Sequence, residues 1–524
     1  MFLSDQISGA KIGKSRNSVL LKSSKSSKGR RNCFSVLNQW RPNPAARKEE
    51  SGIPFVQMDN QFSPRKVPSV CSFRYGLSLL LHVCNSIIIS QRMCLSLTMV
   101  VMVNSSDPHG VPNASTEESL DVMKNPVYNW SPKTQGIIFS SIFYGILIIQ
   151  IPVGYLSEKY SIKKMIGSAL FLSSLFSLIL PMAAEGGEAW IIACRAAQGV
   201  SQGSALIAQH AIWVKWAPPL ERGRLTSLSL SGVLLGPFIV LLVTGFICQS
   251  LGWPVVFYIF GACGCGVSLL WFLLFYDDPK THPCISVSEK NYILSSLNQQ
   301  QSSSRTRSLP IKAMIKSLPL WAIVFGSFAF HWTNNIMLFY TPTFVDSNLH
   351  VNVKENGLLS ALPYLFAWSF GILAGHAADF FLSRNILRLN TIRKLFSTLG
   401  LFLPPFFGLC LIHLSFSFSS TIVFLILTGS TGSFCMAGLL INGLDIAPSY
   451  YGFLKGVTNV IGMIGGLISS ILCGMILNEN PESGWFKIFF LTAGVNVTSL
   501  LFCLIFGKAE IQDWDKDRPE QTRL

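Results

Sequence analysis

The chain has few charged residues. Asp, Glu, Lys and Arg account for 13% of its 524 residues, whereas a soluble protein carries about 25%. Hydrophobic residues make up 50% of the chain and fall in long continuous runs, which exclude a large soluble globular protein. Because these runs do not alternate between apolar and polar residues, they predict helical membrane spans rather than a transmembrane barrel.

The chain also lacks the sequence patterns of a catalytic site. Its 13 cysteines show neither zinc-site nor oxidoreductase spacing, and most suit the role of small packing residues. The apolar runs contain no metal-ligand cluster, nucleophile elbow or paired carboxylates. We therefore expect neither an enzyme nor a bound cofactor.

The apolar runs predict an all-α membrane protein with about twelve transmembrane helices. A basic, Ser-rich tail (1–72) precedes a six-helix half (73–276), a polar central loop (277–318), a second six-helix half (319–507) and a short tail (508–524). The first tail has no apolar core of a signal peptide, and it favours contact with membrane lipid over nucleic acid. The expected spans lie near 73–103, 135–157, 163–184, 187–213, 225–248, 252–276, 319–345, 356–379, 394–417, 419–446, 451–477 and 485–507.

Short motifs of the first half recur in the same order in the second half. The pairs are Gly154 and Glu158 with Gly375 and Asp379, Lys163-Lys164 with Arg393-Lys394, Ala217-Pro218 with Ala447-Pro448, and Gly252-Trp253 with Gly484-Trp485. Their nearly constant separation predicts two parallel repeats, as in two-half secondary transporters.

Basic residues concentrate in the loops on the same side of the membrane as the N-terminus. The positive-inside rule therefore places both termini in the cytoplasm. The loop 104–134 is then on the outer side, and its sequons predict glycosylation at Asn104 and Asn113. At the other end, Thr522 and Leu524 fit a C-terminal peptide that binds a PDZ domain.

Two arginines, Arg92 and Arg195, lie deep in predicted spans, where a charge costs about 2.5 to 3.5 kcal/mol. Arg195 shares one helix face with Gln198, Gln202 and Gln209. No Asp or Glu lies at the same depth, so an internal salt bridge is not available. Carbonyls, amides, water or a bound anion can satisfy these guanidinium groups. We predict a substrate-binding site for anions that includes Arg92, Arg195 and Gln202.

Further polar residues lie on the same or neighbouring spans. His210 follows the polar face of the fourth span, and His331 and Asn335 lie in the seventh. A membrane histidine relays protons or makes one satisfied hydrogen bond. Asparagines line a pathway or join helices. We include these three residues among the candidates for substrate binding.

The turn after the second span carries charges at the edge of the membrane. Gly154, Glu158 and Lys159, together with Asp379 in the matching turn of the second half, suit a gate formed by interlocking helix ends. The alternative is ordinary anchoring by positive charge on the inner side.

Three stretches carry a resemblance to a known family. Lys215-Trp-Ala-Pro-Pro-Leu-Glu-Arg222, Gln150-Ile-Pro-Val-Gly-Tyr155 and Leu444-Asp-Ile-Ala-Pro448 resemble the anion-transporter branch of the major facilitator superfamily. That branch includes vesicular glutamate transporters, sialin and the type I sodium/phosphate cotransporters. The resemblance runs from about Met58 to Leu524, and the type I cotransporters match it most closely.

This resemblance implies a carrier that works by alternating access and moves urate, phosphate and other anions. It also implies sodium as a coupling ion and the apical plasma membrane of kidney epithelium. Arg92 and Arg195 fall at the substrate-linked arginines of the family. Phe139, Gln202 and Phe330 stand where the vesicular members have His, Glu and Arg, so the resemblance does not extend to simple proton coupling.

A different class of function stays open at this point. The PDZ-type C-terminus also fits a membrane scaffold or receptor that anchors a PDZ complex and transports nothing. The buried arginines disfavour it, because scaffolding does not require charges inside the membrane.

Overall fold

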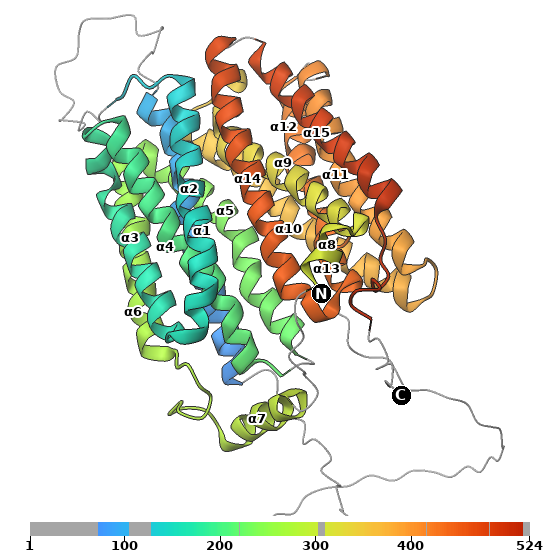
Figure 1. Ribbon diagram of the computed structural model, residues 1–524. Helices are drawn as coiled ribbons and strands as arrows, with labels where there is room; N and C mark the ends of the chain where they lie inside the picture. The colour runs from blue at the N-terminus through green and yellow to red at the C-terminus, as the bar shows by residue number, and fades with distance from the viewer. Residues whose placement is uncertain are drawn as a thin grey trace, which may run out of the picture. The chain divides into compact units, whose positions relative to one another are not determined.

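The computed structural model describes residues 72–103, 127–218, 221–301, 310–414, 417–480 and 483–516. These residues form helices and connecting loops, without a strand (Figure 1). The first group of helices comprises α1 (Phe73–Val103), α2 (Pro132–Lys159), α3 (Ile162–Glu185), α4 (Glu188–Trp216), α5 (Arg222–Leu251) and α6 (Trp253–Leu274). The second comprises α9 (Leu318–Leu349), α10 (Val353–Ser383), α11 (Leu389–His413), α12 (Phe418–Ser430), α13 (Leu439–Ile446), α14 (Tyr451–Glu479) and α15 (Gly484–Phe506).

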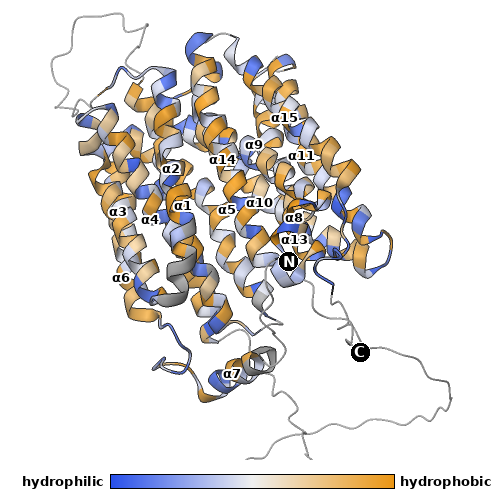
Figure 2. Ribbon diagram, viewed as in Figure 1, coloured by the Kyte–Doolittle hydropathy of each residue, from blue (hydrophilic) through white to orange (hydrophobic). Residues whose placement is uncertain are grey.

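Ten helices in the described ranges are long and apolar enough to cross a membrane. Figure 2 shows that apolar residues dominate their surfaces. α4 and α9, with 29 and 32 residues, are also long enough but are too polar to be among the ten. They lie where the fourth and seventh spans were predicted. Both helices carry polar candidate site residues, and these residues lower the hydropathy of the two helices below that of the other spans.

The tenth predicted span is a broken helix. A 3-10 turn, Thr431–Met436, separates α12 from α13. A Cβ atom on Gly438 would lie 2.4 Å from the main-chain nitrogen of Ser397, so only glycine permits this approach to α11. Arg393 donates from Nη1 to the carbonyl oxygen of Ala437 at 2.6 Å, which satisfies a carbonyl group that the break leaves outside a helix. Continuous hydropathy concealed this break.

The central stretch contains two short helices, α7 (Val287–Gln301) and α8 (Ile311–Ile315). Glu289 of α7 accepts hydrogen bonds from the main-chain nitrogens of Phe73 and Arg74, and so caps α1. The Arg74 guanidinium is fully buried and pairs with Glu289 at 3.2 Å and with Glu221 at 2.5 Å. One arginine thus joins the start of α1, the loop before α5 and α7.

Helices from the first and second groups pack against each other along two seams. One seam joins α2 to α14, and the other joins α5 to α10. Within the first group α1 contacts α5, and α4 contacts both α2 and α3; within the second, α9 contacts α14 and α11 contacts α15. The predicted division of the chain into two repeats is compatible with these contacts and stays a prediction.

Candidate functional site

Arg195 is completely buried between α4 and α1. Its Nη2 donates to the main-chain carbonyl oxygen of Arg92 at 3.1 Å, and its Nη1 donates to Gln198 Oε1 at 2.9 Å and to the carbonyl oxygen of Gln91 at 3.4 Å. The guanidinium therefore bonds mainly to the backbone of α1. In this conformation Arg195 positions the helix that carries Arg92.

Arg92 has a different set of contacts. Its Nε donates to Gln202 Oε1 at 3.1 Å, but its buried Nη2 has no hydrogen-bond partner. The side chain is only 5% exposed. An unpaired N–H of a charged group in a buried place is costly, and a ligand oxygen would remove that cost. Arg195 also has an unpaired buried Nε, but both of its terminal nitrogens are bonded to protein groups. The free terminal nitrogen makes Arg92 the better candidate for direct contact with an anion.

The groups around the two arginines are neutral amides and hydroxyls. Gln202 Nε2 donates to Ser173 Oγ at 3.2 Å, Ser173 Oγ donates to Gln91 Oε1 at 2.7 Å, and Gln198 Nε2 donates to the carbonyl oxygen of Ser173. Neither Arg92 nor Arg195 forms a salt bridge with an acid of the described ranges. The site keeps two positive charges, as an anion site requires.

His331 and Asn335 connect α9 to α14. His331 Nδ1 bonds to the carbonyl oxygen of Ser327 at 2.8 Å, and Asn335 Nδ2 donates to the carbonyl oxygen of His331 at 2.9 Å. Both side chains fill notches at glycines of α14: a Cβ on Gly462 would lie 2.4 Å from His331 Nδ1, and one on Gly466 2.0 Å from Asn335 Nδ2. These contacts favour helix packing over substrate binding for both residues.

The other candidates differ in how far the structure describes them. Asp379 is half-buried near the end of α10. Gly154, Glu158 and Lys159 form the end of α2, and His210 lies in α4; the structure describes the backbone of these four and not their side chains. The residues Asn104, Asn113, Thr522 and Leu524 lie outside the described ranges.

Lys455 is a cation near the start of the predicted span 451–477, and it was not among the candidate site residues. The structure places it in the second turn of α14, where it lines a small cavity with the hydroxyl-bearing residues Ser327, Tyr451 and Thr458. No ion pair in the described ranges includes Lys455. A lysine so close to the long apolar run of α14 was the signal that could have identified it.

The two seams are close-packed near one end of their helices. A Cβ on Gly136 of α2 would lie 2.8 Å from the carbonyl oxygen of Ser470 and 3.0 Å from Gly474 Cα of α14. In the other seam, a Cβ on Gly357 of α10 would lie 2.8 Å from Gly245 Cα of α5. Each seam therefore brings two backbones into contact through a pair of glycines.

Glycines near the opposite ends of the same helices have free space around them. Apart from each helix's own backbone, no heavy atom lies within 4 Å of the position a Cβ would take at Gly223 of α5, Gly375 of α10, or Gly452 and Gly456 of α14. These positions are less tightly packed than the glycine pairs of the seams.

Comparisons with known proteins agree with this architecture. The model of the Major Facilitator Superfamily matches residues 81–470. The chain is 66% identical to sodium-dependent phosphate transport protein 1 of Oryctolagus cuniculus, over 89% of this chain and 100% of the relative. It is 48% identical to a probable small intestine urate exporter of Homo sapiens, over 86% of this chain and 93% of the relative.

Solved structures share the fold at low sequence identity. A D-xylose–proton symporter superposes with a TM-score of 0.61 at 16% identity, covering 84% of this chain and 99% of its own. A bacterial homologue of the human lysosomal transporter Spinster, in an inward-facing conformation, gives a TM-score of 0.58 at 14% identity, covering 83% of this chain and 95% of its own. Fold, family model and relatives agree: the chain belongs to the major facilitator superfamily, in the branch of the sodium-dependent phosphate transport proteins.

Proposed function

We propose that the chain is a secondary transporter that moves anions across a membrane by alternating access. The observation that carries this proposal is the buried pair Arg92 and Arg195, which is embedded in neutral amides and has no acid partner in the described ranges. The free Nη2 of Arg92 supplies a hydrogen-bond donor for an anionic oxygen.

The glycine seams supply the moving parts of this mechanism. Contacts at Gly136–Gly474 and Gly245–Gly357 close one end of the pathway. When these seams separate and the opposite ends of the same helices come together, the arginines become accessible from the other side of the membrane. Rocking of two packed groups of helices around a central site is the usual motion of carriers built from repeats.

Urate and inorganic phosphate are the anions that we propose as substrates, because the relatives of this chain include a probable urate exporter and sodium-dependent phosphate transport proteins. Membrane potential contributes about 2.3 kcal/mol per net charge per 100 mV and drives anions out of a negative cell interior. Uptake of phosphate against that potential requires co-transported cations, for which we propose sodium.

The experiment that separates these two modes uses purified full-length protein in liposomes. Labelled urate and labelled phosphate are offered separately, with and without an inward sodium gradient at zero potential. Phosphate uptake that appears only with the gradient supports cotransport, and urate flux that is the same with and without sodium supports a carrier that does not couple urate to sodium. Absence of flux for both anions in every condition would contradict the proposed function.

The remaining expectations about cellular context are part of the same proposal. We place the protein in the apical plasma membrane of kidney epithelium, with cytoplasmic termini, glycans on Asn104 and Asn113, and a PDZ partner at Thr522 and Leu524. Surface biotinylation of polarised cells that express the full chain, or the chain without Leu524, tests both the apical location and the PDZ contact. The scaffold alternative has no support from the relatives, which are named as transport proteins and an exporter.

A further inference from the structure

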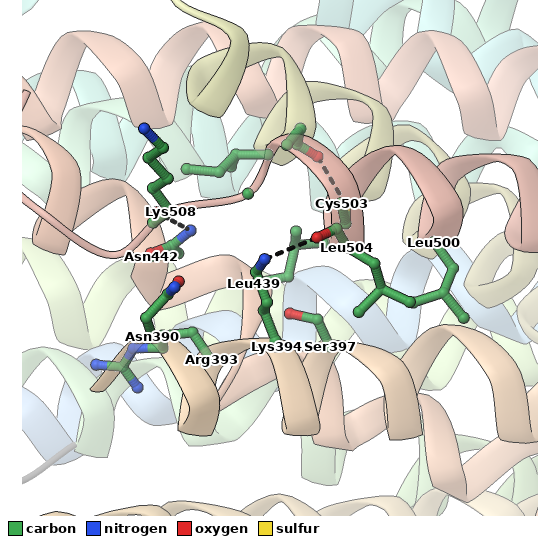
Figure 3. Close-up of a pocket in the computed structure, with 13 residues that line it drawn as sticks. Asn390, Arg393, Lys394, Ser397, Leu439, Asn442, Leu500, Cys503, Leu504 and Lys508 are labelled. Carbon is green, nitrogen blue, oxygen red and sulfur yellow. Dashed lines mark hydrogen bonds between the residues drawn. The ribbon is translucent and has the colours of Figure 1, made fainter. Parts of the chain in front are cut away.

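A small basic pocket lies where α11 begins and α15 ends, on the side of α13 (Figure 3). It is separate from the arginine pair between α1 and α4. The polar residues of its lining that bear on a ligand are Asn390, Arg393, Lys394, Asn442 and Lys508.

The lining has more positive charge than its partners neutralise. Arg393 is paired with Asp445, through Nε at 2.6 Å and Nη2 at 3.3 Å. Lys394 Nζ donates one hydrogen bond, to the carbonyl oxygen of Leu504 at 2.7 Å, and keeps two further donors. Lys508 is exposed. The described residues that line the pocket include no Asp or Glu. Asp513, outside the lining, interacts electrostatically with Lys508, but this carboxylate is fully exposed and solvent screens it. Both ammonium groups therefore stay available to a ligand.

The corresponding corner of the first group of helices contains a carboxylate. There Asp277, just after α6, accepts hydrogen bonds from the main-chain nitrogen of Lys163 at 2.7 Å and from the hydroxyl of Ser161 at the start of α3. After α15 the chain has Lys508 and Ala509 in the equivalent stretch. The second corner therefore has a lysine, Lys508, near the position where the first corner has the carboxylate that binds the start of α3.

The pocket also contains hydrogen-bond acceptors that lack donors. Asn442 is only 7% exposed; its Nδ2 donates to the carbonyl oxygen of Lys508 at 3.1 Å, while its Oδ1 has no partner. Asn390 Oδ1 is likewise buried and unpaired. A ligand that suits this pocket must carry both an anionic group for the lysines and an N–H or O–H donor for the two amide oxygens.

The surface beside the pocket is apolar and exposed. Leu501, Leu504 and Ile505 on the last two turns of α15 are exposed, and Leu395 on α11 is exposed as well. In a membrane protein such a surface faces acyl chains. The ligand is therefore expected to be amphipathic, with its polar group in the pocket and its apolar part along α15.

We propose that this pocket binds the headgroup of an aminophospholipid, such as phosphatidylethanolamine or phosphatidylserine. The phosphate contacts Lys394 and Lys508 in the place that Asp277 occupies in the first corner. The primary ammonium donates to Asn390 Oδ1 and Asn442 Oδ1. This site does not depend on the anion-transport proposal, because it shares no residue with the arginine pair.

Native mass spectrometry of the purified full-length protein tests this site. The protein is mixed with dioleoyl-phosphatidylethanolamine or dioleoyl-phosphatidylcholine, and the fraction that retains one lipid is measured. The ethanolamine lipid should be retained preferentially, because the choline group has no N–H donor. Lys508→Gln, at an exposed position, should weaken retention about fivefold, and Asn390→Ala should remove the preference between the two lipids. Lys487→Gln, at the opposite end of α15, is the matched control and should change neither.

Three results would overturn the proposal. Equal retention of both lipids by the unaltered protein would show that the amide oxygens do not select the headgroup. Unchanged retention in Lys508→Gln would exclude the lysine from the site. Displacement of the lipid by millimolar inorganic phosphate would show that a free anion, not a lipid, fills the pocket.

Discussion

Arg195 donates from Nη2 to the main-chain carbonyl oxygen of Arg92 at 3.1 Å, so one buried cation holds the helix that carries the other. The two residues therefore have different tasks. Arg195 has three hydrogen bonds to protein groups, two of them to the backbone of α1, and an unpaired Nε, whereas Arg92 has one hydrogen bond and an unpaired terminal nitrogen, Nη2. This difference leads to distinct expectations for their variants.

Arg92→Gln should abolish anion flux and leave thermal stability almost unchanged. The substitution removes the positive charge and the free Nη2 donor. The loss of the hydrogen bond to Gln202 is offset, because the protein no longer buries a charge that has no acid partner. Flux in liposomes and thermal unfolding in detergent measure the two effects. A variant that retains the flux of the unaltered protein would exclude Arg92 as an anion ligand.

Arg195→Lys should lower both stability and flux. Lysine keeps the positive charge, but its ammonium cannot reproduce the forked hydrogen bonds to Gln198 and to two carbonyl groups. We expect a loss of about 2 kcal/mol in the free energy of unfolding, measured by denaturant titration in detergent. Normal stability with reduced flux would instead give Arg195 a direct role in substrate binding.

Gly136→Ala and Gly357→Ala should hold the tight end of the seams apart. The added methyl group meets main-chain atoms at 2.8 Å at each position, and such overpacking costs about 1 to 3 kcal/mol. Transport should slow, and single cysteines introduced along the pathway near this end should react faster with an impermeant thiol reagent. Gly266→Ala on α6 and Gly494→Ala on α15 lie outside both seams and have free space around them, so they are the controls and should behave like the unaltered protein.

Lys455→Gln should raise the KM for the transported anion with a smaller effect on the maximal rate. Lys455 lines a cavity with three hydroxyl-bearing residues and is outside the arginine pair, so it attracts the anion without holding it at the centre. We expect KM to rise about fivefold, which corresponds to the loss of one electrostatic interaction of about 1 kcal/mol. Lys487→Gln is the control, since Lys487 is exposed near the start of α15. Equal KM values in both variants would exclude Lys455 from the pathway.

The ion pair between Arg393 and Asp445 should be needed as a pair. Their side chains are 7% and 9% exposed, and removal of one partner from a buried pair costs about 3 to 5 kcal/mol. Asp445→Asn should therefore unfold at lower denaturant concentration, and a combined Arg393→Met and Asp445→Leu variant should recover part of that loss. Additive losses in the double variant would show that the two residues do not interact energetically.

The sequence predicted the helices well because membrane spans follow directly from apolar length. It also identified Arg92 and Arg195, since a charge inside an apolar run is visible without a structure. The break at Gly438 remained hidden, because its cause is the approach of α11 and not a polar residue. His331 and Asn335 looked like pathway residues, and only their fit against Gly462 and Gly466 indicates a packing role.

Long-range partners were beyond the reach of sequence reasoning. Arg74 pairs with Glu221 and Glu289, and no pattern links residues so far apart in the chain. Lys455 was not among the candidate residues, because a basic residue near the end of a span usually marks the membrane boundary. Its place on α14, facing Ser327 of α9, follows from helix packing alone.

The most direct test of anion transport by this chain is the response of urate flux to membrane potential. Purified protein in liposomes receives labelled urate, and a potassium diffusion potential is imposed in either direction without a sodium gradient. Urate should accumulate when the interior is positive and should be excluded when the interior is negative, with Arg92→Gln inactive in both cases. Absence of urate flux, or flux that ignores the sign of the potential, would contradict the account.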